Sequence, residues 1–389
     1  MSIAIRKAER IQKLPRYLFA EIDRLKRAVA ARGVDLISLG IGDPDLPTPP
    51  RVVERLCAAA REPANHRYPD YEGMPAFRAA AAAWMRSRYG VTLDPETEVV
   101  SLIGSKEGIA NMAVAFVDPD DVVLVPDPGY PVYHVGAVFN GGVTYRLPLR
   151  HANGFLPDLG AIPAEVARRA KLLWLNYPNN PTGTVAPRAF LEEAIRFCAR
   201  HEVILCHDAA YAEIYYGERP PSVLELAGGR EVAIEFHSLS KTFNMTGWRV
   251  GFAAGHPELI AGLGKVKTNV DSGVFQAVQE AGIAALTGDP AFVEGLRATY
   301  RERRDVLVGG LAGAGLPCEP PAGTFYVWVP VPRGLTAAEL ARRSIEEAGV
   351  VVTPGNGFGE AGEGYVRLTL CSPIARLREA VERLRALRL

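Results

Sequence analysis

The sequence has no excess of charge of one sign. Its 44 lysines and arginines are balanced by 44 aspartates and glutamates, so the formal net charge of the 389 residues is +0. Proteins that bind nucleic acid or an anionic membrane surface usually carry a basic surplus, because that surplus attracts polyanions. We therefore expect neither nucleic acid nor a membrane among the partners.

Long apolar runs and paired cysteines are also missing. No apolar stretch approaches the roughly 18 residues of a membrane span, and residues 1–12 lack the apolar core of a signal peptide. The five cysteines lie far apart and form no C-x-x-C pair, which fits a reducing compartment. We expect a cytoplasmic protein.

Several familiar cofactor motifs are absent or out of context. The glycine pattern at 357–362 matches the dinucleotide fingerprint, but it leads into a predicted strand and not into a helix that could hold a pyrophosphate. Lys241-Thr242 lacks the glycine of a Walker motif, and the seven histidines show no metal-ligand spacing. A nicotinamide, P-loop or metal-centred chemistry is therefore disfavoured.

Short apolar runs alternate with segments of helical period through the middle of the chain, which predicts an α/β fold with a mainly parallel sheet. The expected strands are 121–125, 144–147, 171–175, 203–206, 232–237 and 249–254, and a helix is expected over 187–201. They read as nearly continuous apolar runs, which is typical of buried parallel strands.

A change of pattern near residue 286 predicts a second domain. A long helix (290–311), a strand (324–329), a helix (337–348) and two further strands (350–353, 365–370) suggest a smaller α+β unit. At about 150 residues per domain, the length also indicates at least two domains. We predict a large domain over 45–285 and a small domain formed by 1–44 together with 286–389.

A polar stretch between two predicted strands, 237–249, contains Lys241. A lysine there lies where α/β folds bind ligands, at the carboxyl ends of strands. Ser238, Ser240 and Arg249 supply the hydroxyls and the guanidinium fork that a phosphate monoester requires. A lysine beside a phosphate site suggests a Schiff base. The alternative interpretation is a surface turn with ordinary polar residues.

Two other strand ends carry polar side chains. Asp208 is placed to pair with a cationic ring nitrogen, as pyridoxal phosphate requires, although an aspartate at a strand end is also a common helix N-cap. Tyr211 and Asn180 are placed to contact the 3-oxygen of the same ring. Each position alone is weak; together they point to one cofactor.

The segment from residue 101 to residue 108 follows an apolar run and opens a predicted helix, so the backbone N–H groups around Ser105 and Lys106 can hold a phosphate. Tyr130 can stack on a flat ring, and core packing is its alternative role.

These motifs resemble those of fold-type I, class I/II pyridoxal-phosphate aminotransferases, and they occur in the family's order across nearly the whole chain. The resemblance implies that Lys241 carries the cofactor and acts as general base, that Asp208 pairs with the pyridine nitrogen, and that Arg367 holds the substrate α-carboxylate. It assigns the 3-oxygen to Asn180 and Tyr211, ring stacking to Tyr130, and the phosphate to Ser105, Lys106, Ser238, Ser240 and Arg249. It also implies a homodimer with shared active sites, in which Tyr68 reaches the neighbouring phosphate.

Within that family, several strings look like those of LL-diaminopimelate aminotransferases: 17–22, 39–49, 207–211, 269–273 and 352–357. That likeness implies that Tyr17, Gly42 and Lys106 line the substrate site beside Asn180 and Arg367. Lys106 and the Tyr17 hydroxyl would then receive the distal carboxylate of the substrate.

One position departs from the pattern. Plant members bind the distal ammonium with a glutamate of the partner subunit, whereas this chain aligns Tyr71, with Glu72 one residue later. Either the loop shifts so that Glu72 serves, or distal selectivity is weaker.

The predicted reaction is amino transfer from LL-diaminopimelate to 2-oxoglutarate, giving tetrahydrodipicolinate and glutamate for lysine biosynthesis. The alternatives are an aspartate, alanine or broad-range aminotransferase and a C–S lyase using the same cofactor. A regulatory module joined to a DNA-binding segment is disfavoured, because the charge balance offers no evident basic footprint. A degenerate, non-catalytic binder is disfavoured as well, since the lysine, aspartate and arginine set is complete.

Overall fold

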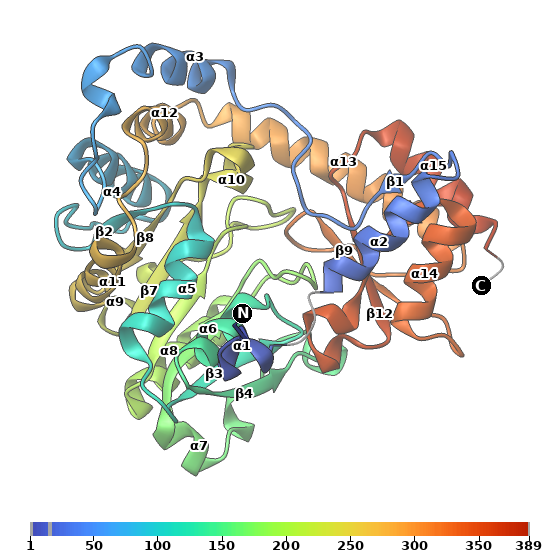
Figure 1. The fold of residues 1–389 in the computed structure, drawn as a ribbon, viewed down its shortest axis with the longest axis horizontal. Coiled ribbons are helices and arrows are strands. Elements are labelled where there is room, and N and C mark those ends of the chain that lie inside the picture. Colours follow the sequence, from blue (N-terminus) through green and yellow to red (C-terminus); the bar gives the residue numbers. More distant parts are fainter. Residues whose placement is uncertain (1–2, 15–17, 388–389) are drawn as a thin grey trace.

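The structure is a computed structural model that describes residues 3–14 and 18–387. Its main element is a seven-stranded sheet with the order β2-β8-β7-β6-β5-β3-β4 (Figure 1). In chain order the strands are β2 (Val99–Leu102), β3 (Val122–Asp127), β4 (Val143–Pro148), β5 (Ala170–Leu175), β6 (Ile204–Asp208), β7 (Ala233–Ser238) and β8 (Gly251–Gly255). The mainly parallel sheet that the apolar runs predict is confirmed.

One strand differs from the prediction. β8 pairs antiparallel with both β2 and β7, although its apolar run was expected to be parallel like the others. The residues between β7 and β8 hold only a four-residue helix, α10 (Leu239–Thr242), and a 3-10 turn. A parallel crossover needs an element long enough to cover the sheet, so the chain turns back directly.

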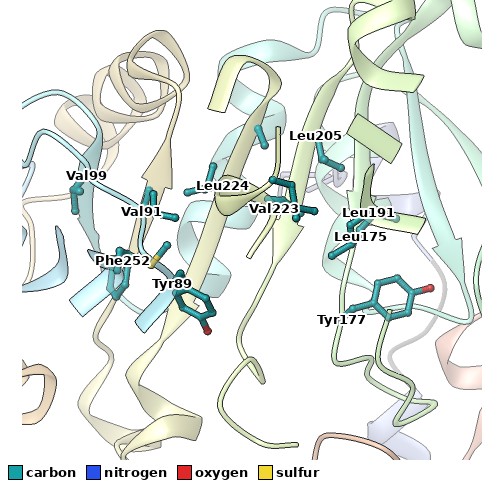
Figure 2. Close-up of a cluster of buried hydrophobic side chains, with 14 of the residues drawn as sticks. Tyr89, Val91, Val99, Leu175, Tyr177, Leu191, Leu205, Val223, Leu224 and Phe252 are labelled. Atoms are coloured by element: carbon teal, nitrogen blue, oxygen red, sulfur yellow. The ribbon is translucent and has the colours of Figure 1, made fainter. Parts of the chain in front are cut away.

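Helices cover both faces of this sheet because alternate strand residues point in opposite directions. Leu124 and Leu173 belong to one apolar core with α4 and α8, whereas Val123 and Leu172 belong to a second core with α5, α6 and α11. Figure 2 shows part of the first core. The helices of this part are α3 (Pro50–Ala59), α4 (Pro75–Tyr89), α5 (Ser105–Phe116), α6 (Val132–Phe139), α7 (Ala164–Arg169), α8 (Arg188–His201), α9 (Gly229–Val232), α11 (Pro257–Val270) and α12 (Gln276–Leu286).

A smaller antiparallel sheet has the order β11-β12-β9. Its strands are β9 (Tyr326–Pro330), β11 (Thr353–Pro354) and β12 (Tyr365–Thr369), and a separate parallel pair joins β1 (Ile37–Ser38) to β10 (Val350–Val351). The surrounding helices are α2 (Leu18–Ala30), α13 (Ala291–Gly313), α14 (Ala337–Ala348) and α15 (Ile374–Arg385). The short helix α1 (Glu9–Gln12) instead contacts α6 of the larger part (Figure 1). The helices predicted over 290–311 and 337–348 and the strands predicted over 324–329 and 365–370 form within a few residues of their expected bounds. The single strand predicted over 350–353 is divided between β10 and β11, which belong to different sheets.

Helix α13 connects the two parts, running from α12 toward the smaller sheet (Figure 1). Val293 near its start packs in the core of the large sheet, while Leu296, Tyr300 and Leu307 pack in the core of the small one. Because one continuous helix contributes to both cores, we propose the domain boundary near residue 286 without a linker. Within the described ranges, no helix has the length and apolar character needed to span a membrane.

Candidate active site

A cavity of about 470 Å³ lies at the carboxyl ends of the central strands and extends to the small sheet. It collects residues from both parts of the chain. Among the predicted site residues it is lined by Gly42, Ser105, Lys106, Tyr130, Asn180, Asp208, Tyr211, Ser238, Ser240, Lys241, Arg249 and Arg367. Segments separated by more than 300 residues in sequence therefore meet at one site.

Asp208 ends β6 at the edge of the cavity and is 5% exposed. Its Oδ2 accepts a hydrogen bond of 2.7 Å from the Tyr133 hydroxyl, and its Oδ1 accepts one of 3.3 Å from the Ala210 N–H. Burial raises the pKa of this carboxyl above its ordinary value, and the Tyr133 hydrogen bond opposes that rise. A buried carboxylate in this setting is stabilised by a cationic ligand group.

Beneath Asp208 lies a buried polar cluster that joins β6 to β7. Glu235 accepts hydrogen bonds from His207 Nδ1 (3.0 Å) and His237 Nε2 (2.7 Å). Although burial opposes its charge, the two histidines lower the pKa of Glu235. Because His207 and His237 directly precede Asp208 and Ser238, the cluster fixes the two strand ends that reach the cavity.

Lys241 lies in α10, directly after β7. Its Nζ donates a hydrogen bond of 3.1 Å to the carbonyl oxygen of Gly42. Burial lowers the pKa of the Lys241 ammonium below its ordinary value. A larger fraction of neutral amine makes this side chain a better nucleophile and base.

Arg249 and the start of α5 form a group of anion-binding donors. Arg249 adopts a left-handed backbone (φ +57°), and its Nη1 donates to the Thr246 carbonyl at 2.9 Å. Gly104 has a left-handed backbone (φ +74°), which favours glycine, and a Cβ there would also lie 2.2 Å from Arg249 Nη2, where the guanidinium crosses the start of the helix. Ser105 opens this twelve-residue helix, whose first N–H groups have no partner within the helix. Together with Ser238 and Ser240 they suit a phosphate group.

Arg367 on β12 is 3% exposed, and both of its Nη atoms are hydrogen-bonded, whereas its buried Nε has no hydrogen-bond partner among the described residues. Its Nη1 donates to Asn180 Oδ1 at 2.6 Å, and its Nη2 donates to the Gly40 carbonyl at 2.7 Å. The guanidinium carbon lies 4.1 Å from the Tyr326 ring centre and 4.6 Å from that of Phe358. Aromatic faces on the guanidinium fix its plane, which prepares it to bind a carboxylate in one orientation. Asn180 uses its oxygen for Arg367, so its amide nitrogen can donate to a ligand.

Tyr211 lies in a turn that follows β6. Its hydroxyl and the Tyr326 hydroxyl are 3.0 Å apart and share a hydrogen bond. A Cβ at position 42 would lie 2.0 Å from the Tyr326 hydroxyl. Gly42 is therefore required by close approach of a tyrosine from the small sheet.

The loop before α4 does not contribute to the cavity of the single chain. Tyr68 is 89% exposed, and Tyr71 and Glu72 are also exposed. Their predicted roles depend on a second copy of the chain and stay predictions. Tyr17 lies outside the described residues.

Several residues of the site were not expected from the sequence. Tyr133 lies three residues after Tyr130, and Asn176 lies four residues before Asn180, so their motifs carried a signal for both. Asp23, Tyr326 and Phe358 come from other elements, and no local pattern points to them. Only the folded arrangement brings them to the cavity.

Comparison with known proteins places the chain among relatives over its full length. A sequence model of the family described as aminotransferase class I and II matches residues 34–384. The LL-diaminopimelate aminotransferase of Moorella thermoacetica is 56% identical over 382 residues, which is 98% of each protein. The substrate-bound BacF structure from Bacillus subtilis superposes with a TM-score of 0.95 at 40% identity, covering 100% of this chain and 98% of that one. The structure of a Thermus thermophilus aspartate aminotransferase double mutant superposes with a TM-score of 0.92 at 33% identity, covering 99% of this chain and 100% of that one.

Proposed function

Because the chain belongs to the class I and II aminotransferase family, we propose that it transfers the amino group of LL-2,6-diaminopimelate to 2-oxoglutarate. The products are tetrahydrodipicolinate, a precursor in lysine biosynthesis, and glutamate. The observation that carries the reaction class is the meeting of Lys241, Asp208 and Arg367 in one cavity. The substrate is supported by curated LL-diaminopimelate aminotransferases that are 53–57% identical over nearly the full chain.

Pyridoxal 5'-phosphate fits the donors of this cavity. Asp208 offers a buried carboxylate to a protonated ring nitrogen, and Tyr130 offers a ring face. Arg249, crossing the glycine that precedes α5, offers a guanidinium to the phosphate. Ser105, Lys106, Ser238 and Ser240 line the same cavity and would add donors around it, while Asn180 and Tyr211 would hold the 3-oxygen. When bound, this cofactor supplies the electron sink that stabilises negative charge at the substrate α-carbon.

The residues of the chain then divide the work of proton movement and binding. Lys241, whose ammonium pKa burial lowers, provides a neutral amine that takes the α-proton and returns it. Asp208 keeps the ring nitrogen protonated, because a buried carboxylate favours an adjacent cation. Arg367 holds the α-carboxylate and thereby orients the bond that loses its proton.

At the distal end of the substrate, Lys106, which lines the cavity together with Gly42, supports binding of the second carboxylate. The family resemblance adds the Tyr17 hydroxyl to this proposed contact. We further propose a homodimer in which Tyr68 reaches the phosphate of the neighbouring site, since its 89% exposure leaves it available to a partner. Glu72 of the same loop would then approach the distal ammonium. Five cysteines without a disulfide fit a reducing cytoplasm.

A panel of amino donors tests the assignment. Purified protein with added pyridoxal phosphate should form glutamate from LL-diaminopimelate and 2-oxoglutarate with ping-pong kinetics. A kcat/KM for aspartate, alanine or an aromatic amino acid well above that for LL-diaminopimelate would replace the substrate with that amino acid. Release of pyruvate and ammonia without an oxo-acid acceptor would indicate a C–S lyase.

A further inference from the structure

The charged side chains that line the cavity can be matched with the charges that it has to bind. Among the described residues these side chains are Asp23, Lys106, Asp208, Lys241, Arg249 and Arg367. Under the proposed function, Asp208, Lys241, Arg249 and Arg367 act at the cofactor or at the α-carboxylate, and Lys106 is placed near the phosphate and at the distal carboxylate. Asp23 is the one side chain of this set without an assigned role, and its charge is opposite to that of Lys106.

A diamino diacid leaves the same two charges unmatched. Once its α-amino and α-carboxylate groups are engaged, its far end still carries one ammonium and one carboxylate. Lys106 accounts for the carboxylate. We infer that Asp23 binds the distal ammonium of the amino donor and so selects a substrate with a second amino group. This inference rests on the proposed function and adds a specificity-determining residue to it, so that Asp23 takes the place proposed above for Glu72 as the main partner of the distal ammonium; the test below distinguishes the two.

The packing of α2 directs Asp23 toward the cavity. Ile22 and Val29 pack on Ile345 of α14 and Val351 of β10, with the partly buried Leu25 beside them. These residues, at i, i+3 and i+7, form one face of the helix. Asp23 lies about 100° from Ile22 around the helix axis, off the packed face, and its side chain lines the cavity.

The Asp23 carboxylate retains capacity for a ligand. Its side chain is 49% exposed, and Lys26 Nζ lies 3.5 Å from Oδ1 one turn along the same helix. A pair this long and this exposed contributes little binding energy. A substrate ammonium that loses water on entering the cavity gains more from the same carboxylate.

Electrostatics also explains how Asp23 discriminates. Aspartate and glutamate present only a carboxylate at the distal end, which Asp23 repels and Lys106 attracts. An amino donor with a distal ammonium and a carboxylate satisfies both side chains. The opposite charges of Asp23 and Lys106 thus disfavour donors with a distal carboxylate alone and favour donors that also carry a distal ammonium.

The test compares LL-diaminopimelate with L-2-aminopimelate, which has the same carbon chain and both carboxylates but lacks the distal ammonium. In Asp23→Asn, kcat/KM for LL-diaminopimelate should fall about three- to tenfold, mainly through KM. The value for L-2-aminopimelate should stay unchanged or rise, and so should that for L-glutamate in the reverse half-reaction. Asp23→Glu should keep most of the preference for LL-diaminopimelate.

Arg27→Gln is the matched control, because Arg27 is an exposed charge on the same helix that does not line the cavity. It should leave both donors unaffected. An equal loss for both donors in Asp23→Asn would reduce Asp23 to a structural role and overturn the inference. Retained discrimination in Asp23→Asn but lost discrimination in Glu72→Gln would assign the ammonium to Glu72 instead.

The wild-type protein separates this inference from the proposed function. If wild type uses LL-diaminopimelate well and Asp23→Asn has the same donor preference as wild type, only the role of Asp23 is overturned. Wild type that prefers L-2-aminopimelate or aspartate overturns both the diaminopimelate assignment and a site for a distal ammonium.

Discussion

The inner end of the cavity, around Asp208 and Lys241, differs in construction from its outer end, around Lys106 and Asp23. Asp208 is fixed by hydrogen bonds from Tyr133 and Ala210, and the strand ends beside it are tied by Glu235. Lys106 and Asp23 are more exposed and come from α5 and α2, which belong to different cores. The difference indicates that chemistry is built on a rigid sheet edge, whereas substrate choice depends on how separate elements meet.

If the inner end performs the chemistry, its loss should have the largest effects. Lys241→Ala should lower kcat by at least about 10⁴-fold, because the variant loses both the cofactor-binding amine and the general base. The measurement is the steady-state rate with LL-diaminopimelate, together with borohydride reduction and peptide mapping. Lys171→Ala, at an exposed lysine on β5, should remain fully active and labelled. Label on a lysine other than Lys241, or on none, would reject the assignment.

Asp208→Asn should lower kcat by about 10²- to 10³-fold, since a buried charge pair broken on one side costs about 3–5 kcal/mol. Tyr133→Phe should have a smaller effect in the same direction, because it removes one hydrogen bond to that carboxylate. Both rates are measured at saturating cofactor. Equal rates for Asp208→Asn and wild type would contradict the proposed pairing of Asp208 with a ring nitrogen.

Asp208→Asn, which should lower kcat, should not destabilise the cofactor-free protein at neutral pH. Burial raises the pKa of Asp208, so the folded protein holds a proton that the unfolded chain has already released. Stability is therefore lost as pH rises from the unfolded pKa of about 4 toward the raised folded value, and this loss persists at neutral pH. At pH 7, apo Asp208→Asn should have a Tm equal to or above that of apo wild type. The gain should disappear below about pH 4; a gain that is independent of pH would point to another cause.

Arg367 lies between the two ends and should show an intermediate effect. Arg367→Lys should reduce kcat/KM about 10²-fold, because lysine cannot reproduce the fork that contacts Asn180 and Gly40 or the stacking on Tyr326 and Phe358. The loss should be common to all amino donors, in contrast to the selective loss expected at Asp23. A loss confined to one donor would move Arg367 to the distal part of the site.

The exposed loop should give the smallest effect. Tyr68→Phe removes one hydrogen bond to a charged phosphate and should weaken cofactor binding about tenfold in a homodimer. Mixing this variant with Lys241→Ala should give heterodimers whose one active site binds the cofactor as tightly as wild type, because both changes would fall in the other site. Verified heterodimers whose active site still binds the cofactor about tenfold more weakly would show that Tyr68 acts within its own subunit, and wild-type affinity in Tyr68→Phe itself would show that it does not act on the cofactor.

Local sequence patterns were sufficient to predict most of the strands and helices and to name the residues that gather at the inner end of the cavity. Apolar runs fixed the strands, and polar residues that follow them, such as Asp208, Lys241 and Asn180, necessarily gather at one edge of a parallel sheet. The candidate phosphate donors could also be predicted, because a helix start and the residues beside it are close together in the sequence. Neither conclusion required knowledge of how distant elements pack.

The direction of one strand and several contacts in the cavity could not be predicted, because they depend on how distant elements pack. The direction of β8 depends on its connection, Gly42 is explained by the Tyr326 hydroxyl, and Phe358 and Tyr326 hold the plane of Arg367. Asp23 reaches the cavity because Ile22 and Val29 pack on α14 and β10, more than 300 residues along the chain. Such contacts follow from the packing of apolar faces on separate elements, and packing fixes side-chain directions that no local pattern specifies.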